Sequence, residues 1–256
     1  MKSSGRRAPA PAFGGNMTEI LAGRGINKTF GSFQVLKDVN FTLAEGEALG
    51  IVGPNGAGKT TLFSVVAGSL VPSTGTVLFS GADVTTVDAA SRCRAGIGRT
   101  HQVPRPFLGM SVFENVLVAA QHGSGRVGAD AGNLAAEALE RSGLLPLANR
   151  PAATLGLLDR KRLELARALA TGPKVLLLDE IGGGLTEAEL GVLVSLISDL
   201  KASGITIVWI EHILHALLKV IDRLICMSAG QVISEGSPRE VMADRAVVGA
   251  YLGGVQ

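Results

Sequence analysis

One stretch of the sequence combines glycines, a lysine and two threonines in a pattern that suits phosphate binding: Gly53, Pro54, Asn55, Gly56, Ala57, Gly58, Lys59, Thr60 and Thr61. Glycines carry no Cβ atom, so successive backbone N–H groups can converge on an anion at the start of the following helix. Lys59 can place a positive charge at the terminal phosphates, and the Thr60 hydroxyl can bind Mg²⁺. An apolar strand precedes the stretch and a helical pattern follows it, so the sequence predicts a phosphate loop rather than a glycine-rich turn without a ligand.

Two acidic residues end the apolar run KVLLLDE at 174–180. A carboxylate at the end of a buried strand is costly unless it meets a cation, and ligands of parallel sheets bind at that end. Asp179 is therefore the predicted partner of Mg²⁺, and Glu180 is the predicted base that polarises an attacking water. A strand-end acid can also cap the next helix, but the phosphate loop favours the catalytic interpretation.

Three other residues are weaker candidates when each is taken alone. His212 follows the apolar run at 206–210, where a lone histidine is more often structural than functional. Gln102, in GIGRTHQ, could be an ordinary surface residue, because glutamines are common on protein surfaces. Phe30 could belong to the core or could stack on a nucleotide base.

The chain around these residues alternates short apolar runs with helical patterns, which predicts an α/β fold with a mostly parallel sheet. Small antiparallel strands are expected within 18–50, and a hairpin followed by short helices is expected near the C-terminus. The segment 88–160 reads as a helical insertion. The remaining expected elements are strands 47–53, 75–81, 174–179 and 205–210, and helices through about residue 68 and at 111–122, 133–143, 160–171, 187–203 and 212–220.

The amino-acid composition argues against a nucleic-acid-binding protein, a cysteine metal site and a membrane-spanning helix. With 24 basic and 22 acidic residues the net charge is +2, and the basic residues are scattered, so no nucleic-acid partner is expected. Two cysteines without metal-ligand spacing favour a reducing compartment. The most apolar window, 204–228, is no candidate membrane span, because it is interrupted by Glu211, His212, Lys219, Asp222 and Arg223. Residues 1–16 lack an apolar signal core and read as a disordered extension, with Met17 as an alternative start.

The order of these motifs resembles the ATPase subunit of ABC transporters over about residues 19 to 253. The resemblance implies that Gly53 to Thr61 form the Walker A loop, that Asp179 is the Walker B acid and that Glu180 is the catalytic glutamate. It also implies ATP and Mg²⁺ as cofactors, with Thr60 and Asp179 at the metal.

The same resemblance assigns roles to the three weaker candidates. Phe30 falls at the aromatic position that stacks on adenine. Gln102 falls at the Q-loop residue that senses Mg²⁺ and the membrane partner, and His212 at the switch histidine that contacts the γ-phosphate.

Finer features are similar to importers of branched-chain and other hydrophobic amino acids. GIGRTHQ resembles their G-I-x-R-T-F-Q, with His101 in place of Phe. MSVFENVLVA, RLELARALA, DEIGGGLTEAE and the ending VVGAYLG are also similar. Importers of urea or short amides share these features, so that alternative remains open.

The family signature, L-S-G-G-Q or L-S-Y-G-Q, is altered in this chain. The run ARAL at 166–169 fixes the register, so that Leu155 matches the leading Leu. The four residues that follow depart from the pattern: Gly156, Leu157, Leu158 and Asp159.

These departures predict a weakened contact with the ATP held by the opposite subunit. Gly156 lacks the hydroxyl that Ser donates to the γ-phosphate, Leu158 adds bulk and Asp159 adds a negative charge. The backbone amides and the helix dipole remain. The expectation is therefore two unequal ATP sites, and the alternative is a variant signature that works through backbone amides. Thr186, where the family has Asp or Asn, predicts a capping box with Glu189.

The resemblance implies a P-loop ATPase with an N-terminal antiparallel β subdomain. Its core would span about 17–90 and 160–256, with a helical subdomain at about 90–160. Two such subunits, identical or different, would close head-to-tail beneath hydrophobic permease subunits on the inner face of the cell membrane, served by a substrate-binding protein. Rival interpretations are a soluble ABC-type ATPase acting on nucleic acid or ribosomes, and a pseudo-ATPase. The single ATPase unit and the presence of Glu180 and His212 argue against them.

Overall fold

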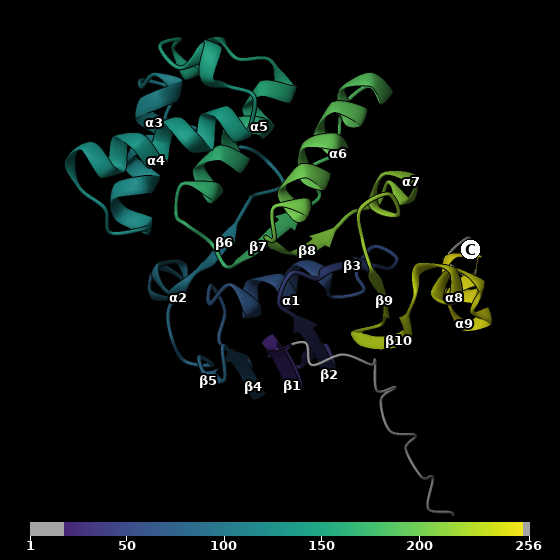
Figure 1. The fold of residues 1–256 in the computed structure, drawn as a ribbon. Helices are drawn as coiled ribbons and strands as arrows, with labels where there is room; N and C mark the ends of the chain where they lie inside the picture. Colours follow the sequence, from purple (N-terminus) through teal and green to yellow (C-terminus); the bar gives the residue numbers. More distant parts are fainter. Residues whose placement is uncertain (1–17, 253–256) are drawn as a thin grey trace, which may run out of the picture.

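The ends of one parallel sheet position most of the candidate residues in this computed structural model, which describes residues 18–252. The extension expected at 1–16 and the alternative start at Met17 lie outside the described residues. The sheet has the strand order β10-β9-β3-β8-β7-β6 (Figure 1). Its strands are β3 (Ala48–Val52), β6 (Ile97–Arg99), β7 (Val175–Asp179), β8 (Thr206–Ile210), β9 (Arg223–Ser228) and β10 (Gln231–Gly236).

All strands of this sheet except one are parallel to their neighbours; the exception, β10, pairs antiparallel to β9 at the edge. Every residue of β3, β7 and β8 is buried, as expected for strands covered on both faces. The continuous apolar runs of the sequence are therefore the central strands. Their carboxyl ends carry the residues expected to do chemistry.

A second, antiparallel sheet comes from the N-terminal part of the chain, as the sequence predicts. Its order is β2 (Phe33–Ala44), β1 (Glu19–Phe30), β4 (Thr74–Phe79) and β5 (Ala82–Asp83). The short pieces expected within 18–50 merge into two strands of 12 residues each. Register shifts interrupt the pairing of these strands and account for the broken sequence pattern.

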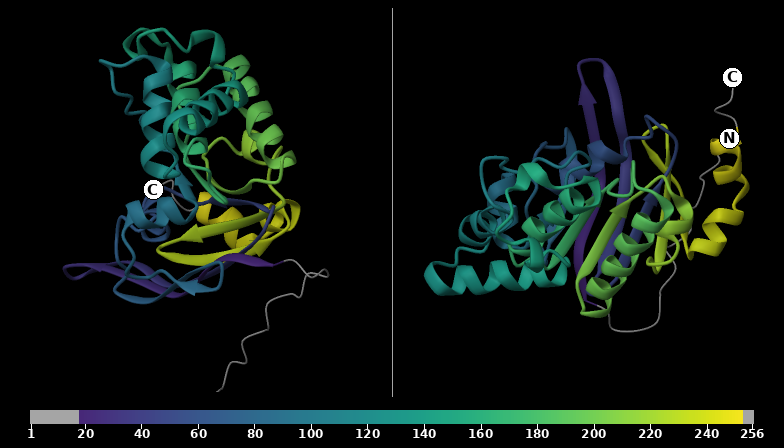
Figure 2. Two further views of the ribbon diagram at one scale, coloured as in Figure 1. Left: turned by 60° about the vertical axis from the view of Figure 1, so that its left-hand side comes forward. Right: turned by 90° about the horizontal axis from the view of Figure 1, so that it is seen from above.

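Helices cover the parallel sheet and form a separate group beyond its β6 edge (Figures 1 and 2). In the left view of Figure 2 the long β1–β2 ribbon lies at the bottom of the molecule and the helices α3, α4 and α5 lie at the top. The helices are α1 (Lys59–Val66), α2 (Ala89–Ala95), α3 (Val112–Gly123), α4 (Gly128–Arg141), α5 (Leu157–Leu169), α6 (Glu187–Ala202), α7 (Leu214–Leu217), α8 (Pro238–Ala243) and α9 (Arg245–Leu252), with 3₁₀ turns at Leu145–Leu147 and Ala152–Thr154. None of the helices within 18–252 is long and apolar enough to cross a membrane.

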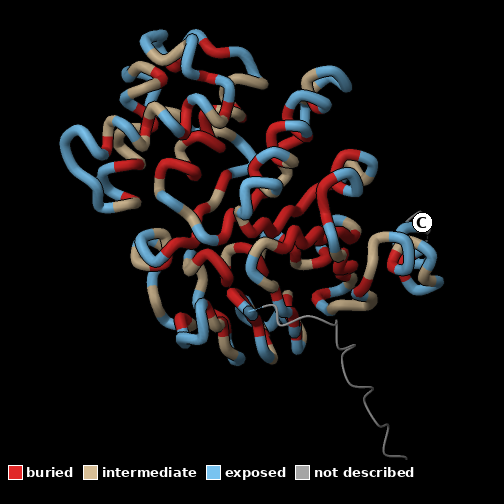
Figure 3. The backbone as a smooth tube through the Cα atoms, viewed as in Figure 1, coloured by how far each residue is buried: buried red, intermediate tan, exposed pale blue. Residues whose placement is uncertain are grey.

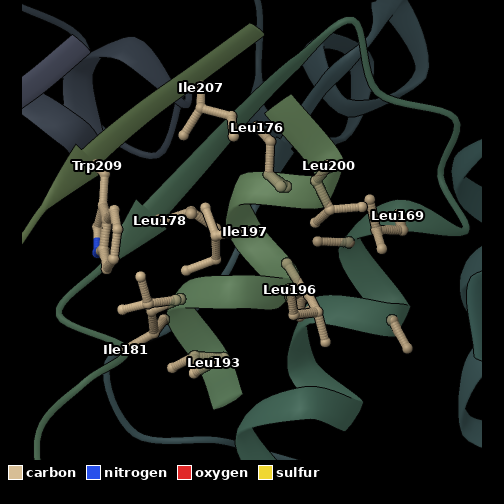
Figure 4. Packing of buried hydrophobic residues seen from close by; sticks show 14 of the residues in the cluster. Leu169, Leu176, Leu178, Ile181, Leu193, Leu196, Ile197, Leu200, Ile207 and Trp209 are labelled. Atoms are coloured by element: carbon tan, nitrogen blue, oxygen red, sulfur yellow. The ribbon is translucent and has the colours of Figure 1, made fainter. Parts of the chain in front are cut away.

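Buried residues concentrate in the sheet and where the helices face it (Figure 3). On one face, Leu193 and Ile197 of α6 pack against Leu178 and Trp209 of the sheet (Figure 4). On the other face, α1 contributes Phe63 to a second cluster shared with β1 and β2. The ends of β7 and β8 are therefore held from both sides.

Four expected boundaries are wrong. The segment from 88 is not helical throughout, because β6 joins the sheet; three residues are too few to show a strand pattern. Helix α4 begins at Gly128 rather than at 133. Helix α5 begins at Leu157 rather than at 160. The helix expected at 212–220 is reduced to α7, because the N–H groups of His212 and Ile213 donate to a carboxylate instead.

Candidate functional site

The phosphate-loop stretch links β3 to α1 and wraps closely over the sheet. Gly53 has φ 145°, and a Cβ atom there would lie 2.1 Å from the carbonyl oxygen of Met227, so no larger residue fits. Gly58 is the N-cap of α1 in the left-handed region, with φ 96°, and no side chain caps the helix. The first N–H groups of α1 therefore have no side-chain competitor for an anion.

The ammonium group of Lys59 is buried at this loop. Its Nζ atom donates to the carbonyl oxygens of Gly53, at 2.7 Å, and Pro54, at 3.1 Å. Burial lowers the pKa of Lys59, while the nearby carboxylates of Glu180 and Asp179 act in the opposite direction. A buried cation above a glycine loop and a helix N-terminus fits a phosphate group.

Asp179 ends β7 and is buried, with 3% of its surface exposed. Its Oδ2 atom accepts a hydrogen bond of 2.8 Å from Arg99 Nη2, in an ion pair between neighbouring strands. Among the described residues, neither Asp179 Oδ1 nor the hydroxyl of Thr60 has a hydrogen-bond partner. Carboxylate and hydroxyl oxygens suit a hard cation, so these two residues fit Mg²⁺.

Glu180 brings together three candidates that lie far apart in the sequence. Its Oε2 atom accepts a hydrogen bond of 2.5 Å from Gln102 Nε2, and its Oε1 atom lies 2.7 Å from His212 Nε2. The Glu180 side chain is 16% exposed and the His212 side chain 43% exposed. A half-buried carboxylate fixed on both sides beside a phosphate loop is oriented for base catalysis on water. Gln102 reaches Glu180 and forms no hydrogen bond to Asp179 within the described residues.

The carboxylate of Glu211, which is 2% exposed, fixes the position of His212. Glu211 Oε2 accepts from the backbone N–H of Gly182 at 2.9 Å, and Oε1 accepts from the backbone N–H groups of His212 and Ile213. One side chain therefore ties the turn after β7 to the loop after β8. Glu211 was not predicted from the sequence, although it follows the buried strand β8 just as Glu180 follows β7.

Residues 156–159, which were compared with the family signature, lie at the start of α5. Gly156 is the N-cap, and a Cβ atom there would meet no other atom within 4 Å. Leu158 is half-buried and packs against the main core. Leu157 is 43% exposed, and Asp159 accepts from Arg162 Nη1 at 3.3 Å.

The segment after β6 is attached to α5 through buried Glu164. Its carboxylate contacts His101 Nδ1 and Arg167 Nη1, each at 3.0 Å, and these hydrogen bonds and charges lower the pKa of Glu164 against the opposing effect of burial. Arg167 also lies 5.0 Å from the centre of the Phe107 ring. His101 thus forms a polar link between the segment that bears Gln102 and helix α5.

Phe30 lies at the end of β1, away from the core, with 48% of its surface exposed. The ammonium group of Lys28 sits 5.1 Å from the centre of its ring. The exposed face excludes the alternative that Phe30 is an ordinary core residue. Thr186 and Glu189 form the predicted capping box at the start of α6.

Comparison with known proteins identifies the family. The family model described as "ABC transporter" matches residues 36–182, and that described as "Branched-chain amino acid ATP-binding cassette transporter" matches residues 231–255. The chain belongs to the ABC transporter ATP-binding family. The predicted P-loop fold of the ABC ATPase type is confirmed, and membership makes the chain an ATP-binding, ATP-hydrolysing transport protein.

Individual relatives cover almost the whole chain. The branched-chain amino acid transport ATP-binding protein LivG of Salmonella typhimurium is 36% identical, covering 91% of this chain and 98% of its own. The lipopolysaccharide export ATP-binding protein LptB of Haemophilus influenzae is 31% identical, with coverage of 91% and 97%. A crystal structure of an ATP-binding cassette of an ABC transporter in its ADP conformation has a TM-score of 0.83 and 35% identity, covering 92% of this chain and 99% of that chain.

Replacement of Glu211 by Ala tests its structural contribution. The change leaves the N–H groups of Gly182, His212 and Ile213 without their acceptor, and we expect a loss of about 1–3 kcal/mol of unfolding free energy. Denaturant unfolding followed by the fluorescence of Trp209, the single tryptophan, measures the loss. Hydrogen exchange should also quicken at 180–184 and 211–213.

The matched control is Glu137→Ala, an exposed glutamate of α4, which should change stability little. If Glu211→Ala were as stable and as protected as Glu137→Ala, the bridging role of Glu211 would be refuted.

Proposed function

We propose that this chain is the ATPase subunit of an importer for branched-chain or other hydrophobic amino acids. The main support for ATP hydrolysis is that Gln102 and His212 both contact the carboxylate of Glu180 beside the phosphate loop. The solute class is supported by the C-terminal family match at 231–255 and by the similarity to LivG. LptB is nearly as similar along the chain, so overall similarity alone does not name the solute.

In the proposed reaction the phosphate loop, Gly53 to Thr61, holds the phosphates of ATP. Lys59 exchanges its contacts with loop carbonyls for contacts with phosphate oxygens, and the exposed ring of Phe30 stacks on the adenine. Mg²⁺, held by Thr60 and Asp179 with Gln102 nearby, would neutralise charge on the phosphates. None of these steps requires a rearrangement of the buried strands.

Glu180 is the proposed base for the attacking water. Its carboxylate accepts the proton as the oxygen attacks the γ-phosphorus and the bond to the β-phosphate oxygen breaks, releasing ADP and phosphate. His212 orients Glu180 and donates toward the γ-phosphate. Gln102 contacts Glu180, so a change in the position of Glu180 during the reaction moves the segment that follows Gln102.

That segment also supplies a surface suited to a membrane partner. Val103 is 66% exposed, Phe107 44% and Leu108 55%, so three large apolar side chains lie in solvent within a few residues of Gln102. We propose that hydrophobic permease subunits on the inner face of the cell membrane cover this patch, with a substrate-binding protein acting on their other side. The division into a core at about 17–90 and 160–256 and a helical subdomain at about 90–160 belongs to the same proposal.

The start of α5 is the proposed contact with ATP held by a second ATPase subunit. Gly156 offers backbone N–H groups and the positive end of the helix dipole, but no hydroxyl. If the partner carries an unaltered signature, the two ATP sites are unequal, and the site completed by this chain is the slower one.

Uptake measurements test the proposed function. In cells deleted for the gene, the wild-type chain should restore uptake of labelled leucine, and Glu180→Gln should not. ATP turnover of the purified transporter should fall about 10²–10⁴-fold in Glu180→Gln, with ATP binding retained, because only the base is lost.

The control Glu187→Gln alters an acid with an 81% exposed side chain and should behave as wild type. Restoration of urea uptake instead of leucine uptake would identify a urea or short-amide importer. Full turnover in Glu180→Gln would refute the proposed base.

Addition of a hydroxyl group at position 156 tests whether the two ATP sites hydrolyse ATP at unequal rates. Gly156→Ser has room for its side chain, and a hydrogen bond to a charged phosphate contributes about 1.5 kcal/mol, so we expect transporter turnover to rise roughly tenfold. Ala153→Ser, which adds a hydroxyl one turn earlier at an exposed position, is the control. Unchanged turnover in Gly156→Ser would favour the alternative in which backbone amides suffice.

A further inference from the structure

Arg99, the last residue of β6, contacts the predicted metal ligand Asp179. Its Nη2 atom lies 2.8 Å from Asp179 Oδ2, and the two side chains are 16% and 5% exposed. Strands β6 and β7 run parallel, with Arg99 paired to Leu177, so the arginine reaches along the sheet edge to the end of its neighbour. The pair lies inside the protein, where geometry rather than solvent sets its orientation.

The guanidinium group of Arg99 is itself held by the helix that follows the phosphate loop. It lies 6.0 Å from the centre of the Phe63 ring, and its Nη1 atom is 3.4 Å from Ser64 Oγ, both on α1. Arg99 therefore spans from the helix that begins at Lys59 to the acid at the end of β7. A flexible surface arginine would not be restrained in this way.

The next residues along the chain continue the same set of contacts. The backbone N–H of Asp179 donates to Thr100 Oγ1 at 3.2 Å, and the N–H of Thr100 donates to the carbonyl oxygen of Leu177 at 2.9 Å. Two residues later, Gln102 holds Glu180. A segment of four residues thus fixes the backbone and the side chain of one acid and the side chain of the next.

Metal-binding carboxylates depend on such partners. A carboxylate with one oxygen held by a donor presents the other in a fixed direction, and loss of the donor commonly weakens metal binding. In this structure the guanidinium group holds Oδ2, while Oδ1 has no hydrogen-bond partner within 18–252. A planar guanidinium fixes orientation better than the point charge of a lysine.

We propose that Arg99 is a positioning residue for the magnesium site: by holding Asp179 Oδ2 it orients Oδ1 toward the cation of Mg²⁺·ATP. The inference rests on the proposed function, because it requires that Asp179 bind the cation. Arg99 also joins the metal site to the segment bearing Gln102, so that the cation and the base Glu180 are set by the same stretch of chain. A purely structural role would instead have Arg99 only neutralise a buried charge.

The test is a magnesium titration of nucleotide binding to the full chain, with a fluorescent ATP analogue as the probe. In Arg99→Met the Mg²⁺ concentration for half-maximal binding should rise about tenfold, since removal of a metal site's outer partners typically costs 10–100-fold. Binding of the analogue in EDTA should not change, because Arg99 is not expected to contact the nucleotide. Arg99→Lys should fall between wild type and Arg99→Met.

Arg94→Met is the matched control, because Arg94 is an exposed arginine of α2 whose side chain donates to Ser91 Oγ and lies away from the site, and it should titrate as wild type. Circular dichroism checks folding, and if Arg99→Met is unfolded, the Lys variant gives the deciding titration. A magnesium requirement that is unchanged or lowered, or equal losses of binding with and without Mg²⁺, would overturn the positioning role. A wild-type chain whose binding ignores Mg²⁺ would instead overturn the proposed metal site, and the inference with it.

Discussion

The carboxylate of Glu180, held between Gln102 Nε2 and His212 Nε2, is the constraint on which the site depends. The three residues follow β6, β7 and β8, which are consecutive in the parallel sheet, so their loops meet at one edge. Glu180 leaves β7 with φ 47°, a left-handed conformation that costs a non-glycine residue about 1–2 kcal/mol. Its backbone N–H donates to the carbonyl oxygen of Ile210 on β8, which helps to hold this conformation.

Cations and hydrogen-bond donors stabilise the acidic residues of the site. Lys59 lies over the phosphate loop, and Arg99 neutralises Asp179 from the neighbouring strand. Glu211 accepts from backbone N–H groups on both sides of the site, interacts with the charge of buried Lys161, and thereby ties the turn after β7 to the loop at His212. Because each buried charge has partners, the site can be assembled before nucleotide arrives, which limits the reorganisation required for hydrolysis.

The sequence alone predicts those residues whose type and position in the chain indicate their role. Lys59 could be predicted from the glycine-rich pattern that contains it, and Asp179 and Glu180 because they end a buried apolar run. The parallel core was predicted from such apolar runs. Arg99 and Glu211 were missed because their partners are 80 and 29 residues away, and strand order is not visible in a single sequence. The start of α5 at Leu157 was missed because residues 156–159 were compared with the family signature and were assigned to the segment before the helix. Leu158 then proved to pack inward, since helical geometry, and not motif position, sets its direction.

The central claim is that Gln102 and His212 act through one group, the carboxylate of Glu180. A double-mutant cycle on transporter ATP turnover tests this claim directly, with Gln102→Ala, His212→Ala and the double variant compared with wild type. If both residues work by holding Glu180, each single variant should lose most of the turnover and the double variant should lose little more. Losses that multiply in the double variant would show that the two residues act independently, and would contradict the account.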